Sequence, residues 1–147
     1  KNFTDRLMPM WQPYLIFRNG IASHPRRYPD FNPKSVVLLS TSGFPERSHF
    51  NAMEKAFALM ADGLTSNPPC IICCAGGTLL TVPGVAESMQ WYTDAVKKAG
   101  SEVASDNKIN QQTQAVLDKP LVEDVNFYVN TANEQWRAMG IELINVP

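Results

Sequence analysis

The chain has 147 residues, of which 44% are hydrophobic and 18% are charged, as is typical of a single soluble globular domain. The formal net charge is −1, and the Arg26-Arg27 pair is too short a basic cluster to support nucleic-acid binding. No apolar stretch approaches the roughly 20 residues that cross a bilayer, and the N-terminus lacks the pattern of a secretory signal. We therefore expect a cytoplasmic protein without a nucleic-acid or membrane partner.

The first ten residues show a helical pattern. Phe3, Leu7 and Met10 recur at helical spacing, and Pro9 is expected to end the helix. Because no capping residue precedes them, the sequence is expected to enter this helix partway. We interpret the chain as a domain that is incomplete at its N-terminus.

A hairpin arm is predicted next. Asn19-Gly20 lies between apolar residues, and both central residues of a type I′ turn need positive φ. Pro25 is expected to degrade the second strand. Five aromatic residues surround the arm, and we favour an interface with a partner over a lid that stacks on a ring. These residues are Trp11, Tyr14, Phe17, Tyr28 and Phe31.

The centre of the chain has a strand, helix, strand pattern. A nearly continuous apolar run at residues 35–40 and a second at 70–75 indicate strands buried on both faces, as in parallel sheets. Between them an amphipathic helix is predicted, with Ser48 as its cap and Gly63 as its left-handed end. This order is a βαβ unit with parallel strands. The apolar stripe of the helix is Phe50, Met53, Phe57, Met60 and Leu64.

Three more helical segments follow, near residues 85–99, 110–117 and 125–139. Their aromatic residues are expected to pack in the core or between helices. These residues are Trp91, Tyr92, Phe127, Tyr128 and Trp136. Only two central strands are predicted, and a two-stranded parallel sheet is not a stable unit by itself. We therefore expect additional sheet from a missing N-terminal part or from other copies in a homo-oligomer.

Two motifs carry a resemblance to a known family. KNFTDRLMP at residues 1–9 and LLSTSGFPERSHF at residues 38–50, together with the order of elements, resemble the C-terminal half of the flavodoxin-like NAD(P)H-dependent FMN reductases. The resemblance covers most of residues 1–140. It implies an α/β fold with a partial flavodoxin-like parallel sheet flanked by helices, to which this chain adds the N-terminal β-hairpin arm and extra C-terminal helices. Residues 1–147 would then form a single flavodoxin-like domain that lacks its phosphate-binding half.

The family's phosphate-binding turn has no counterpart in this sequence. Members of the family bind the FMN phosphate at a Ser/Thr/Gly-rich turn followed by a helix N-terminus. The only glycine-rich stretch, Gly76-Gly77 and Gly84, fits neither GxGxxG nor GxxxxGK[ST]. FMN is therefore expected to contact the loop that the chain retains.

That loop follows the first central strand. Ligands bind beyond the carboxyl ends of strands in open α/β sheets, and the small polar and aromatic residues there suit a flat ring with polar edges. The alternative interpretation is that Ser, Gly and Pro merely turn the chain and cap the next helix. The resemblance places four residues at the edge of the isoalloxazine ring and two nearby: Thr41, Ser42, Gly43 and Phe44, then Glu46 and His49.

The activity implied by the resemblance is FMN-dependent oxidoreduction. Hydride would pass from NAD(P)H, as co-substrate, to the flavin, and electrons would then pass to a small-molecule acceptor. Because the cofactor carries the redox chemistry, no residue is assigned as a catalytic acid or base. The competing hypothesis is a non-catalytic C-terminal fragment that folds and oligomerises without a cofactor.

The cysteines and histidines do not indicate another chemistry. Cys70 and Cys73 have CxxC spacing, but an offset of three on a strand places them on opposite faces. We interpret them, and Cys74, as small buried hydrophobes. His24 and His49 lack an acidic companion at ligand spacing, so no metal site is predicted.

Overall fold

The computed structural model of the chain describes residues 5–31, 33–142 and 144. They form a mixed α/β fold around a parallel pair of strands, β3 (Val37–Ser42) and β4 (Cys70–Ala75). A short 3-10 helix, η2 (Arg47–Phe50), leads into α2 (Asn51–Leu64), which connects the two strands. The predicted strand, helix, strand unit with parallel strands is therefore present.

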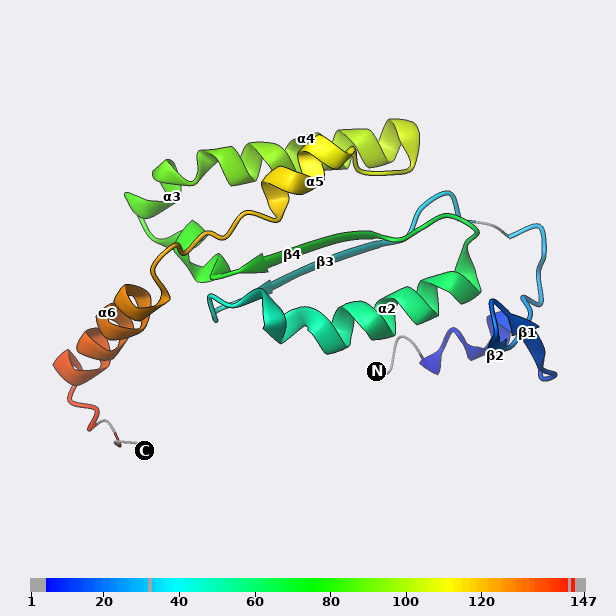
Figure 1. Ribbon diagram of the computed structural model, residues 1–147, viewed down its shortest axis with the longest axis horizontal. Helices are drawn as coiled ribbons and strands as arrows, with labels where there is room; N and C mark the ends of the chain where they lie inside the picture. Colours follow the sequence, from blue (N-terminus) through cyan, green and yellow to red (C-terminus); the bar gives the residue numbers. More distant parts are fainter. Residues whose placement is uncertain (1–4, 32, 143, 145–147) are drawn as a thin grey trace.

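Helices cover both faces of the strand pair (Figure 1). α2 lies on one face, and α4 (Gln90–Asp106) and α5 (Gln111–Leu117) lie on the other. After β4, the 3-10 helix η3 (Gly77–Thr81) and α3 (Val85–Ser88) lead into α4. The main buried cluster lies between β4, α4 and α5 and consists of Ile72, Cys74, Tyr92, Ala95, Ala99 and Leu117.

The N-terminal arm agrees with the hairpin prediction. β1 (Ile16–Arg18) and β2 (Ile21–Ser23) pair antiparallel, and Asn19 and Gly20 have φ values of 51° and 78°, as a type I′ turn requires. Before the arm, η1 (Met8–Met10) contains Pro9. Asp5 is helical and Arg6 and Leu7 form a turn, so the opening helix ends shortly before Pro9, in agreement with the prediction. Pro9 itself lies in the first turn of η1, where its missing N–H would have no partner. Phe3 lies outside the described residues.

The arm, which with the Trp11–Arg26 bridge spans residues 11–26, is attached to the end of α2. The Trp11 indole Nε1 donates to the Gly63 carbonyl at 3.2 Å, and Arg26 Nη1 donates to the Leu64 carbonyl at 3.4 Å. Arg18 donates to the Asp62 carbonyl. The last carbonyls of a helix have no partner within the helix, and positive side chains suit the negative end of its dipole. Three arm side chains therefore cap the C-terminus of α2.

The predicted ends of this helix were wrong. Ser48 lies inside η2 and caps neither helix with its side chain. Gly63 does not adopt a left-handed conformation but lies within α2, one residue before its last. A Cβ on Gly63 would come within 2.8 Å of Trp11 Nε1. Glycine is needed there because of the close approach of the indole.

β3 is less buried than predicted. It begins two residues later than expected and alternates between half-buried and exposed positions, with Leu39 68% exposed. Among the described residues the central sheet has only β3 and β4, so one edge of each strand lacks a partner. The sequence prediction of two central strands is confirmed, but the prediction that both faces of β3 are buried was wrong.

The C-terminal helix α6 (Val125–Ala138) has its predicted position in the sequence. Figure 1 shows that it projects away from the sheet and its covering helices. Phe127 is 69% exposed and Trp136 is also exposed, which contradicts their predicted packing, as does the partial exposure of Trp91. Of the five aromatic residues on the three later helices, only Tyr92 is buried, at 2% exposure. Within the described ranges, no helix has the length and apolar character needed to cross a membrane.

Candidate functional site

The segments after β3 and β4 meet at the carboxyl edge of the strand pair. The Gly76 amide donates to the Phe44 carbonyl at 2.7 Å, and Thr41 Oγ1 donates to the Cys74 carbonyl at 3.2 Å. Both bonds join residues more than 30 positions apart in the sequence. The edge is therefore a single connected surface at the place where open α/β sheets bind ligands.

Gly77 leaves no room for a side chain beside Thr41 at this edge. A Cβ on Gly77 would lie 1.9 Å from Thr41 Oγ1, a separation that no side chain tolerates. Thr41 and Ser42 are the last residues of β3, although the sequence placed them at the start of the loop. Ser42 Oγ accepts a hydrogen bond from the Phe44 amide at 3.0 Å. These two hydroxyls hold the shape of the turn around Gly43.

Phe44, His49 and Glu46 form a cluster beside the start of α2. The Phe44 and His49 rings stack with centroids 4.6 Å apart and an interplanar angle of 26°. His49 Nε2 lies 3.5 Å from a Glu46 carboxylate oxygen, an acidic companion that sequence reasoning did not assign. Phe44 is still 63% exposed. Because His49 covers one face of the ring, the other face remains available to a flat ligand.

Tyr128 on α6 also contacts the loop. Its hydroxyl donates to the Gly43 carbonyl at 2.8 Å and lies 3.4 Å from Thr78 Oγ1. Sequence reasoning missed both residues, because no local pattern links positions 85 residues apart. On the β4 side of this edge the sequence offered only Gly76-Gly77, which was considered only as a phosphate loop.

Arg47 fixes η2 to the strands rather than offering a free positive charge. Its guanidinium donates to the Cys73 carbonyl at 3.0 Å and to Glu54 at 2.9 Å, and it lies 3.7 Å from Asp118. Two carboxylates therefore match its charge. A phosphate would have to compete with them.

The three cysteines are buried and free of disulfides. Burial, and then the neighbouring Glu54, raises the pKa of the Cys73 thiol to about 11, and burial also raises the pKa of Cys70. A thiol with a raised pKa is a poor nucleophile and metal ligand at neutral pH. Among the described residues, no group of three or more His, Cys, Asp and Glu side chains could hold a metal ion.

An apolar cavity of about 580 Å³ lies beside the edge, between the exposed face of β3 and α4. Leu39, Leu80 and Val96 form part of its wall, and its volume is in the range of small-molecule sites. Of the six predicted site residues, only Thr41 lines it. The structure therefore gathers Phe44, Glu46 and His49 in an exposed cluster and places Thr41 in the lining of the cavity.

Comparisons of the chain with family models, with curated proteins and with solved structures give no match.

Proposed function

We propose that the chain forms the ring-binding part of an FMN-dependent NAD(P)H oxidoreductase, as the C-terminal portion of a flavodoxin-like domain. The observation that carries the proposal is the exposed Phe44 ring at the carboxyl edge of two parallel strands. Stacked aromatic rings gain about 0.5–1.5 kcal/mol beyond the effect of area burial. A flavin ring is a flat partner of this kind.

The residues present fit the flavin ring and not its phosphate. Phe44 would stack on the ring, and Gly43, without a side chain, would let the backbone approach the ring edge. Glu46 would hold His49, whose imidazole covers the opposite face of Phe44. The charge of Arg47 is matched by Glu54 and Asp118, so no phosphate subsite is assigned. When bound, FMN would supply the hydride and electron transfer between NAD(P)H and a small-molecule acceptor.

A binding comparison tests this proposal. Because the retained loop faces the ring, riboflavin and FMN should bind this chain with equal affinity, measured by quenching of flavin fluorescence. Phe44→Ala should weaken both affinities by roughly fivefold or more, since base–aromatic stacking contributes about 1–3 kcal/mol. Phe17→Ala removes an exposed aromatic ring on the distant arm and should change neither affinity. Equal affinities for wild type and Phe44→Ala would contradict the proposal.

A second candidate function is a non-catalytic scaffold that assembles with further copies. The observation that favours it is apolar exposure in two places: Leu39 on β3 and Tyr14, Phe17 and Phe31 on or near the arm. Large exposed apolar patches commonly mark interaction sites. Sedimentation velocity should then show a homo-oligomer, and Phe17→Ser should dissociate it. A monomer that binds riboflavin would favour the first function, and a colourless oligomer that does not bind it would favour the second.

A further inference from the structure

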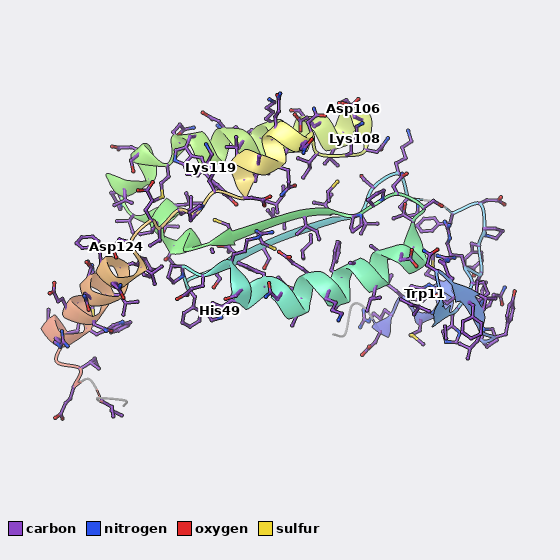
Figure 2. The ribbon with its side chains drawn as sticks, viewed as in Figure 1. Trp11, His49, Asp106, Lys108, Lys119 and Asp124 are labelled. Atoms are coloured by element: carbon purple, nitrogen blue, oxygen red, sulfur yellow. The ribbon has the colours of Figure 1, made fainter. Side chains whose placement is uncertain are left out.

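A second cavity lies between the arm and the end of α2. Its volume is about 470 Å³, which is in the usual range for small-molecule sites. Trp11, Met8 and Met60 contribute to its wall, and Ala22 on β2 borders it. Figure 2 shows Trp11 where the arm meets α2 and His49 at the other end of this helix. The cavity is therefore separate from the carboxyl edge of the strands.

The walls of this cavity are held in place from both sides. Trp11 and Arg26 donate to carbonyls of the last turn of α2. Within the arm, the Gln12 amide donates to the Pro25 carbonyl and the Arg27 amide to the Met10 carbonyl, each at 2.8 Å. A ligand would not have to order these segments on binding, which reduces the entropic cost of association.

The charge of the lining is positive. Arg27 lies at the exposed rim, and no acidic residue is among the described residues that line the cavity. No described carboxylate forms an ion pair with Arg27. His24 Nδ1 lies 3.1 Å from the Tyr14 carbonyl. Because a carbonyl only accepts, Nδ1 donates in this contact.

We propose that this cavity binds a small planar aromatic carboxylate. The indole of Trp11 and the thioethers of Met8 and Met60 are suitable contacts for an aromatic ring. The Arg27 guanidinium offers paired donors that match the geometry of a carboxylate. This site does not depend on the flavin proposal, because it lies at the other end of α2.

The probe for this site is 2-naphthoate, with the neutral 2-naphthamide as its matched analogue. Binding is measured by isothermal titration calorimetry and by the nitrogen-15 shift of the Trp11 indole, identified by its loss in Trp11→Phe. We expect 2-naphthoate to bind at least about tenfold more tightly than 2-naphthamide, because only the carboxylate pairs with Arg27. Arg27→Gln should remove this preference, whereas Arg137→Gln, on α6, should leave it intact.

A second variant tests the location. Ala22 is exposed and borders the cavity, so Ala22→Leu should narrow the cavity without disturbing the core and weaken both probes. The proposal is overturned if 2-naphthoate does not bind at millimolar concentration, if the amide binds equally well, or if Arg27→Gln keeps the preference in a variant whose circular dichroism matches wild type. Unchanged binding in Ala22→Leu would also overturn it.

Discussion

The Trp11 indole donates a hydrogen bond to the Gly63 carbonyl at 3.2 Å and lies so close that a Cβ on Gly63 would come within 2.8 Å of Nε1. Trp11 thus caps the C-terminus of α2. It also requires glycine at position 63, the second-to-last residue of that helix. The position of the arm, and with it the cavity beside Met60, depends on this contact.

Gly63→Ala should destabilise the protein by about 1–3 kcal/mol, because the new methyl group overpacks against the indole. The matched control is Gly100→Ala. Gly100 also lies within a helix, α4, but nothing lies within 4 Å of the position that an added Cβ would take there. Replacing glycine by alanine at this position should stabilise by about 0.5–1 kcal/mol. Urea denaturation measures the change in unfolding free energy of each variant. Equal changes at the two positions would contradict the contact between Trp11 and Gly63.

Gly77→Ala should disrupt the carboxyl edge of the strands, because the added Cβ would collide with Thr41 Oγ1. Thr41→Ala removes that oxygen, so the double variant should recover part of the stability lost in Gly77→Ala. A double-mutant cycle should give a coupling energy of about 0.5–3 kcal/mol. Strictly additive effects would show that the two residues do not touch in solution.

Tyr128→Phe removes the hydrogen bond from α6 to the Gly43 carbonyl. We expect a loss of about 0.5–1.5 kcal/mol and faster hydrogen exchange in the first turns of α6, since no residue of this helix is fully buried. Tyr28→Phe is the control, because Tyr28 is an exposed tyrosine near the arm. If both variants exchange at the wild-type rate, the Tyr128 contact does not hold α6.

Glu102 should make stability depend on acidic pH. Its carboxylate accepts from the Asn110 amide at 2.9 Å and from Thr113 Oγ1 at 2.7 Å, and the Asn110 bond is the main cause that lowers the pKa of Glu102. A carboxyl whose pKa is lower in the folded state stabilises the fold above its unfolded pKa, and this stabilisation is lost as the pH falls through the folded value.

The urea midpoint should therefore decrease as the pH falls from about 5 to about 3. Glu102→Gln should reduce this dependence, and Glu134→Gln, at an exposed position on α6, should not. An unchanged pH profile in Glu102→Gln would mean that the carboxylate is not the group that titrates.

The sequence predicted the elements whose signals are local. The Asn19-Gly20 turn, the strand at residues 70–75 and the span of α6 all agree with the structure. Burial was harder to predict, because a Val/Leu run has the same sequence whether or not other elements cover it. Among the described residues β3 pairs only with β4, and its Leu39 is exposed.

Long-range contacts account for the remaining differences. Trp11 contacts Gly63 from 52 residues away, and Tyr128 contacts Gly43 from 85 residues away. Neither pairing leaves a periodic or spacing signal. For the same reason the sequence indicated the loop at Gly43 but not Gly77 or Tyr128, which help to build the site.

The loop of Gly43, Phe44 and His49 is the flavin-ring site that we propose. The most direct measurement is a titration of nitrogen-15 labelled protein with riboflavin, followed by amide chemical shifts. We expect saturable shifts concentrated in residues 41–49 and at Gly76 and Gly77, with the arm and the end of α2 unaffected. Shifts confined to other regions, or no shifts in residues 41–49 at saturating riboflavin, would contradict this proposal.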